Sequence, residues 1–164
     1  GPGAENQVKA LVRTLKLYGD KRGLIYVNQH AVRGWILPFL DDAGIKYACI
    51  NGATSAKDRT VIMHKFNVEK SLDVIITSVT TAIDLDCDFV IFYEFTVDVK
   101  QMIGRAYRGL GDKVLDVLFV ITDDSNEVDY FCRSILARSL MIRRILGINC
   151  EEVSMIADEL VKRI

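Results

Sequence analysis

Histidine is scarce in this sequence, and its cysteines are widely separated. The chain has two histidines and four cysteines among 164 residues, and no C-x-x-C motif brings two cysteines together. Structural zinc sites need several cysteine or histidine ligands at short spacings. A zinc module is therefore excluded, so we predict no metal ligand and expect reduced, mostly buried thiols.

Neither sign of charge is in excess, and no long apolar run is present. Lysine and arginine number 21 against 22 aspartates and glutamates, which gives a net charge of -1. This balance argues against a broad polybasic surface, so any nucleic-acid contact must be local and rely partly on backbone amides and hydroxyls. No apolar run reaches the about 18 residues of a membrane span, and the N-terminus lacks a signal-peptide layout. We expect an intracellular protein, cytoplasmic or nuclear, with no membrane partner.

Glycine-rich nucleotide-binding loops are also absent. The sequence contains no G-x-x-x-x-G-K-[ST] motif, so nothing in it predicts a cradle for nucleotide phosphates and magnesium. It also has no G-x-G-x-x-G after its first predicted strand, which disfavours a dinucleotide-dependent oxidoreductase or a methyltransferase.

Half of the residues are apolar, which is enough for one domain with a buried core. Hydrophobic periodicity predicts helices over about 5–18, 31–43, 55–66, from Ser125 or Asn126 to 146, and over 151–164. Short apolar runs predict strands over about 24–27, 46–50, 72–77, 89–93 and 114–121. We expect Pro38 to kink the second helix or mark an earlier boundary, and Ser55 to cap the third.

The alternation of strands and helices predicts the fold class. Such an order implies right-handed crossovers between parallel strands, with helices on both faces of the sheet. We therefore expect an α/β protein, a three-layer α/β/α sandwich with a mostly parallel sheet, plus C-terminal helices. We assign the main domain to residues 4–146, a helical extension to 147–164, and a cloning remnant to 1–3.

The most informative stretch is residues 100–109, which carries the pattern Q-x-x-G-R-x-x-R. In a helix, Gln101, Arg105 and Arg108 stand at i, i+4 and i+7 and share one face. That face can bind phosphates, because a planar guanidinium can hold two phosphoryl oxygens. Gly104 costs about 1 kcal/mol against alanine in a helix interior, which indicates a close approach to the backbone. The alternative is a solvent-exposed amphipathic helix.

These segments resemble the second RecA-like lobe of superfamily-two helicases and translocases, especially Swi/Snf-type and related phage or viral motors. The similarity spans about residues 23–131. Residues 23–29, GLIYVNQ, resemble the strand called motif IV, which ends in a polar residue near the nucleic-acid backbone. Asn51-Gly52, followed by Arg59 and Phe66, matches the small-residue turn and the R-x-x-x-x-x-x-F helix of the family.

Residues 77–84, TSVTTAID, resemble motif V. The resemblance implies that Thr77 and Ser78 contact nucleic acid and that Asp84 approaches the ribose of the nucleotide. Asp86 is the alternative to Asp84, because the family usually has glycine where Ala82 stands and this loop is one residue short.

Residues 101–108 match motif VI at all four of its fixed positions. The resemblance implies that Arg105 and Arg108 are arginine fingers, that Gln101 belongs to the same catalytic set, and that Gly104 lies at the nucleotide. Arginine fingers are worth about 10³ to 10⁵ in rate.

The resemblance implies the C-terminal motor lobe of an ATP-dependent helicase or translocase. ATP and Mg²⁺ would be bound mainly by a missing P-loop lobe of the same polypeptide, so the fragment alone is expected to be inactive. Nucleic acid, with DNA favoured over RNA, would be gripped by loop residues Asn28, Gln29, Asn51, Gly52, Thr77 and Ser78. The alternative is a non-enzymatic RecA-like adaptor or degenerate helicase half that binds nucleic acid or protein.

Overall fold

The computed structural model describes residues 2–78, 86–93 and 116–120. Its helices are α1 (Pro2–Tyr18), α2 (His30–Asp42), α3 (Ala56–His64) and the π-helical segment η1 (Lys65–Glu69). Its strands are β1 (Gly23–Tyr26), β2 (Tyr47–Ile50), β3 (Val74–Thr77), β4 (Phe89–Phe92) and β5 (Asp116–Phe119). The helices expected up to residue 146 and over 151–164 lie outside the described residues.

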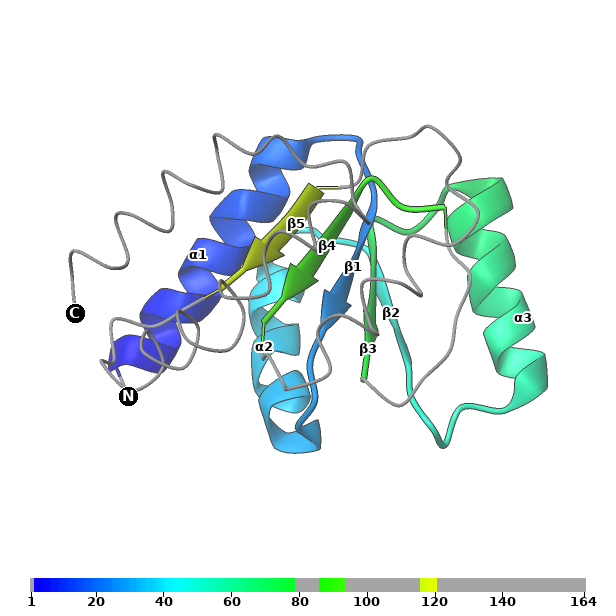
Figure 1. Cartoon of the computed structure of the whole chain (residues 1–164), viewed down its shortest axis with the longest axis horizontal. Helices are drawn as coiled ribbons and strands as arrows, with labels where there is room; N and C mark the ends of the chain where they lie inside the picture. Colours follow the sequence, from blue (N-terminus) through cyan, green and yellow to red (C-terminus); the bar gives the residue numbers. More distant parts are fainter. Residues whose placement is uncertain (1, 79–85, 94–115, 121–164) are drawn as a thin grey trace, which may run out of the picture.

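The five strands form one parallel sheet in the order β2-β3-β1-β4-β5. Each neighbouring pair is joined over four residues, so Ile50 and Tyr26 both lie opposite Thr77, and Tyr26 lies opposite Phe92 on its other side. This register aligns the carboxyl ends of the strands along one edge of the sheet (Figure 1). The predicted parallel sheet is confirmed.

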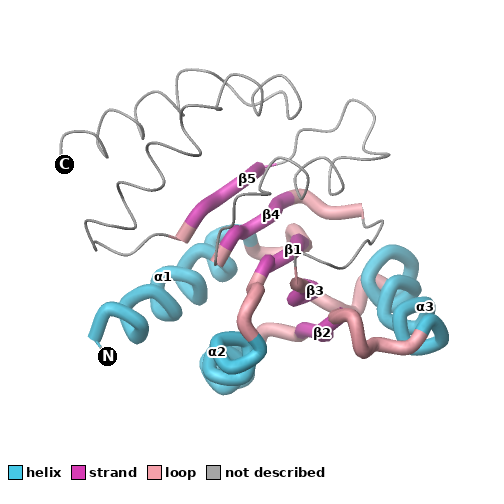
Figure 2. The backbone as a smooth tube through the Cα atoms, turned by 60° about the horizontal axis from the view of Figure 1, so that its bottom comes forward, coloured by secondary structure: helices cyan, strands magenta, loops and turns pink. Residues whose placement is uncertain are grey.

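Helices α1 and α2 cover one face of the sheet. Their buried side chains pack against alternate residues of β1, β3 and β4, including Ile25, Ile76 and Ile91. The chain moves two strand positions from β1 to β2 and one position back to β3. Right-handed crossovers in opposite directions place α2 and α3 on opposite faces, and Figure 2 shows α3 beside β2 and β3, away from α1 and α2. The expected layering of helices about a sheet is confirmed.

Two aspartates join neighbouring strands at the amino edge. The Asp73 carboxylate, just before β3, accepts from the backbone N–H of Lys46 at 2.8 Å, just before β2. The Asp88 carboxylate, just before β4, accepts from the N–H of Arg22 at 3.0 Å, just before β1. The N–H of Asp73 also donates to the carbonyl of Lys46 at 2.8 Å, and the N–H of Asp88 donates to the carbonyl of Arg22 at 2.7 Å. The starts of these four strands are therefore fixed in pairs.

Helix α2 continues through Pro38 from His30 to Asp42. Proline lacks the N–H that would bond the carbonyl four residues earlier, which belongs to Gly34. Pro38 and Gly34 are both exposed, so water can satisfy that carbonyl. The helix ends at Asp42 with Ala43 as its C-cap, and Gly44 then adopts a left-handed φ of 70°.

Ser55 caps α3 as predicted, since its Oγ accepts from the N–H of Asp58 at 3.1 Å. The helical path runs beyond the expected end, because α3 stops at His64 and η1 carries the chain to Glu69. The Lys65 carbonyl accepts from the N–H groups of both Lys70 and Ser71, which widens this last turn. None of the helices in the described ranges is long and apolar enough to cross a membrane.

Candidate nucleic-acid interface

Three loops that are far apart in the sequence meet at the carboxyl edge of the sheet. Asn51 follows β2, Ser78 follows β3, and Asn28 comes two residues after β1. These strands are neighbours in the order β2-β3-β1, and their last residues are paired in register. The N–H of Val27 donates to the carbonyl of Thr77 at 2.9 Å, so the pairing extends to the loops. The structure thus places the six residues singled out in the sequence at one edge of the sheet, five of them in loops and Thr77 as the last residue of β3.

Asn51 organises the turn after β2. Its side-chain oxygen accepts from the N–H of Ala53 at 2.8 Å, and its own N–H donates to the Thr54 hydroxyl at 3.0 Å. Its carbonyl accepts from the N–H of Thr54 at 3.1 Å. This is an Asx-type turn, which leaves the exposed Gly52 at its tip.

Arg59 fastens this turn to α3. Its Nη2 donates to the Asn51 carbonyl at 3.0 Å, which adds a charged donor to a group already bonded to Thr54. The Arg59 Nε is buried and has no partner among the described residues. Sequence reasoning singled out Arg59 only through the spacing to Phe66, and it missed Thr54 altogether.

Thr77 and Ser78 are placed differently at the end of β3. The Thr77 residue is fully buried, and its hydroxyl donates to the Ser78 carbonyl over 3.4 Å. Ser78 is half-buried and follows the strand. Ser78 is therefore the more exposed of these two hydroxyl-bearing residues, while Thr77 lies within the core.

Gln29 is the N-cap of α2 and has extended backbone angles, φ −89° and ψ 129°. Asn28 and Gln29 are both exposed. His30, the first residue of α2, accepts at Nδ1 from Nη2 of Arg33, which is only 8% exposed. A buried guanidinium and a helix N-terminus both favour negative charge at this corner of the sheet. The sequence predicted the exposed amides but not the buried arginine.

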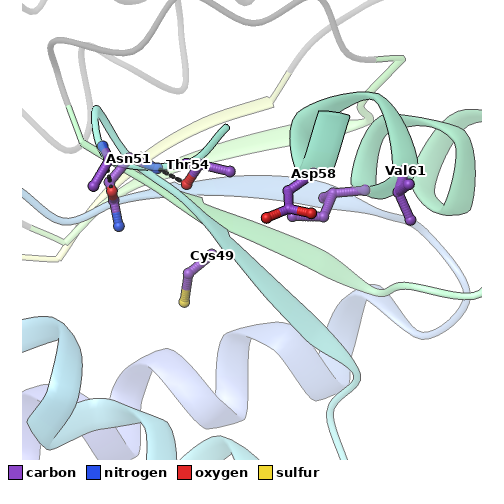
Figure 3. A pocket seen from close by; sticks show the side chains of 7 residues that line it. Cys49, Asn51, Thr54, Asp58 and Val61 are labelled. Carbon is purple, nitrogen blue, oxygen red and sulfur yellow. Dashed lines mark hydrogen bonds between the residues drawn. The ribbon is translucent and has the colours of Figure 1, made fainter. Parts of the chain in front are cut away.

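A hollow of about 410 Å³ lies between the end of β2 and α3, lined by residues that include Cys49, Asn51, Thr54, Asp58 and Val61 (Figure 3). Burial raises the pKa of the Cys49 thiol, and the Arg33 guanidinium opposes this shift only in part. The thiol is therefore protonated at neutral pH and is a poor nucleophile. Among the side chains around this hollow, those of Asn51 and Thr54 can donate hydrogen bonds to phosphate oxygens, whereas the Asp58 carboxylate can only accept them.

The remaining predicted site residues, Asp84, Gln101, Gly104, Arg105 and Arg108, lie outside the described residues. Asp86, the alternative to Asp84, is exposed, and its N–H donates to the Asn67 side chain at 3.0 Å. This bond ties the segment before β4 to η1.

Metal ligands do not cluster in the described ranges. No group of three or more histidine, cysteine, aspartate or glutamate residues within them could hold an ion. The described polar residues at the carboxyl edge carry amides and hydroxyls, which suit phosphate and sugar oxygens; they are Asn28, Gln29, Asn51, Thr54 and Ser78.

Residues 6–109 match the family described as the helicase conserved C-terminal domain. The C-terminal part of the Fun30 ATPase domain superposes with a TM-score of 0.67 at 19% identity, covering 94% of this chain and 52% of that chain. The C-terminal domain of the DEAD-box protein Dbp5 superposes with a TM-score of 0.63 at 19% identity, covering 94% of this chain and 91% of that one.

The E. coli DEAD-box protein SrmB, solved bound to regulator of ribonuclease activity A, gives a TM-score of 0.61 at 23% identity, with 71% of each chain covered. No curated protein matches the sequence significantly. The chain spans about half of the Fun30 structure, 52% of its length. These likenesses confirm the RecA-like fold expected from the sequence.

Proposed function

Because the chain belongs to the helicase conserved C-terminal domain family, we propose that it is the C-terminal motor lobe of an ATP-dependent nucleic-acid helicase or translocase. The observation that carries the proposal is the meeting of three loops at one edge of the sheet, after β2, β3 and β1. One strand of nucleic acid lying across this edge would meet Asn51 and Gly52, then Ser78, then Asn28 and Gln29.

The chemistry of this edge supports phosphate contacts that depend little on net charge. The chain carries a net charge of -1, so long-range attraction contributes little to affinity. Side-chain amides, hydroxyls and backbone N–H groups bind phosphate oxygens without reading base sequence. Loops of this kind suit a protein that moves along a strand, because every nucleotide presents the same phosphate. We propose DNA in preference to RNA, following the Swi/Snf-type resemblance.

The ATP site of the proposed motor is shared between two lobes. Arg105 and Arg108 would stabilise charge on the transferred phosphoryl group, with Gln101 beside them, while Asp84 and Gly104 would contact the nucleotide. The family match runs to residue 109 and so includes the whole Q-x-x-G-R-x-x-R stretch. ATP and Mg²⁺ would be held mainly by a P-loop lobe of the same polypeptide, within the cell. Opening and closing of the two lobes would then move the gripping loops along the strand.

The proposal is tested by comparing the lobe alone with the same lobe joined to a P-loop lobe. The lobe alone should show no nucleic-acid-stimulated ATP hydrolysis, whereas the joined protein should show it. In the joined protein, Gln29→Ala and Ser78→Ala should each raise the nucleic-acid concentration for half-maximal stimulation about fivefold, the cost of about one hydrogen bond. Lys21→Ala, an exposed change at the amino edge, is the matched control.

Single-stranded DNA and RNA of one sequence are compared in the same assay. If the lobe alone hydrolyses ATP and this activity survives further purification, the proposal that it holds only part of the ATP site would be contradicted. A joined protein that binds nucleic acid without hydrolysing ATP would instead favour the adaptor.

A further inference from the structure

A groove of about 360 Å³ lies between α1 and α2, on the face of the sheet that these two helices cover. The residues that matter in its lining are Lys9, Val12, Arg13, Lys16, Phe39 and Asp42. Both helices end where β1 and β2 begin, and Asp42 is the last residue of α2. The groove therefore extends toward the amino edge, whereas the three loops of the candidate interface lie at the carboxyl edge. We call it the α1–α2 groove.

One wall of the α1–α2 groove is cationic. Lys9, Arg13 and Lys16 stand at i, i+4 and i+7 on α1 and are all exposed. Lys9 lies 3.4 Å from the Glu5 carboxylate, an exposed pair worth little. Within the described residues, Arg13 and Lys16 make no ion pair. The groove thus presents unpaired positive charge although the chain as a whole is slightly acidic.

The other wall and the floor are apolar and aromatic. Val12 and Phe39 are half-buried and pack against the core. The Trp35 ring, 40% exposed, lies outside this lining but has its centroid 5.1 Å from that of Phe39, so it extends the aromatic surface beside the groove. Tryptophan and arginine are enriched among the residues that dominate binding at protein interfaces. An aromatic wall facing a cationic wall favours a ligand that has an apolar side and an acidic side.

We propose that the α1–α2 groove binds a short acidic amphipathic helix of a partner protein. Apolar side chains of that helix, repeated at i and i+3 or i+4, seat on Val12 and Phe39, while its carboxylates face Arg13 and Lys16. Asp42 at one end of the groove repels a carboxylate there and so sets the direction in which the helix lies.

Nucleic acid fits the α1–α2 groove less well. Phosphates would use the three cations but gain nothing from the apolar contact of Val12 and Phe39. A strand bound there would also lie near the amino edge, away from the gripping loops. The proposed docking site is therefore separate from the motor site and does not depend on it.

The test uses the full chain and a fluorescein-labelled helical peptide with glutamates on one face and leucines on the other. Binding is followed by fluorescence anisotropy. The double variant Arg13→Glu/Lys16→Glu should bind the peptide at least tenfold more weakly than the parent. Lys57→Glu/Lys65→Glu, an equal change of charge at exposed positions on α3 and η1, should bind within twofold of it. Trp35→Ala should weaken binding at least threefold, and circular dichroism should show every variant folded.

Equal binding by the parent and the Arg13→Glu/Lys16→Glu variant would overturn the proposal, as would an equal loss in the Lys57→Glu/Lys65→Glu control. A photo-reactive group at position 16 identifies the occupant. A cross-link to the peptide supports the proposal. A cross-link within the chain, between two copies, or preferentially to an added oligonucleotide would overturn it.

Discussion

Arg59 illustrates how one residue can shape the candidate interface without lying at its surface. Its guanidinium donates to the carbonyl of Asn51, which is also bonded to Thr54, so the turn after β2 is held from two sides. The turn in turn presents Gly52 at the carboxyl edge. Arg59 is therefore a positioning residue, since it acts on the proposed ligand only through the turn.

We predict that Arg59→Ala will loosen this turn. A hydrogen bond from a charged donor contributes about 1.5 to 3 kcal/mol, and Arg59 is half-buried, so its loss should be felt mainly at residues 51–54. Amide hydrogen exchange at these residues should become at least about tenfold faster. Arg59→Lys should restore part of the protection, because an ammonium keeps the charge but lacks the planar fork. Lys57→Ala, exposed on the same helix, should leave the exchange rates unchanged. Equal exchange rates at residues 51–54 in all three variants would refute the role of Arg59 in holding the turn.

At the scale of elements, the sequence predicted which described segments are helices and strands better than it predicted where each begins and ends. The apolar runs located all five strands, but β3 was expected from Leu72 and begins at Val74. Asp73 explains the difference, because its carboxylate and N–H bond to Lys46 ahead of the paired strand. A side chain that bonds to a distant backbone leaves no periodic signal. The π-helical turn of η1 was unpredictable for the same reason, since it depends on which N–H groups reach the Lys65 carbonyl.

Helix α2 provides a prediction at this scale. Pro38→Ala should raise the free energy of unfolding by about 1 to 2 kcal/mol, because proline costs about 3 kcal/mol in a helix interior and part of that is offset by its stiffer unfolded chain. The restored N–H can bond the exposed Gly34 carbonyl. Gly34→Ala, where a methyl group meets nothing within 4 Å, should add about 1 kcal/mol by propensity alone. Urea unfolding checks both; a destabilised Pro38→Ala variant would mean that proline relieves strain in this helix.

At the scale of the whole molecule, the candidate interface depends on strand order. Sequence spacing placed Asn28, Asn51 and Ser78 after separate strands, and resemblance supplied a reason for them to act together. The order β2-β3-β1, however, arises because the chain moves two strand positions from β1 to β2 and one position back to β3. Hydrophobic periodicity does not reveal the length or direction of these crossovers. Buried groups such as Arg33 were missed because burial follows from this packing and not from residue type. Because the sequence contains no P-loop, any test of the proposed ATP hydrolysis must supply a P-loop lobe as well.

The last prediction concerns Arg105 and Arg108, tested in this lobe joined to a P-loop lobe. Arg105→Ala and Arg108→Ala should each lower kcat by about 10² or more, because an arginine finger stabilises charge that develops mainly in the transition state. Affinity for nucleic acid should change by no more than a few-fold, since the loops proposed to contact it follow β1, β2 and β3, whereas Arg105 and Arg108 come after β4 in the sequence. Steady-state hydrolysis and nucleic-acid titrations separate the two effects.

The lysine variants distinguish charge from geometry at the same two positions. Arg105→Lys and Arg108→Lys should recover only part of kcat, because lysine keeps the charge but cannot meet two phosphoryl oxygens with one planar group. Parental rates in both alanine variants, with unchanged circular dichroism, would make residues 101–108 a solvent-exposed helix face. The non-enzymatic adaptor would then become the better account of this lobe, because the proposed contacts of its loops with nucleic acid do not require a catalytic arginine.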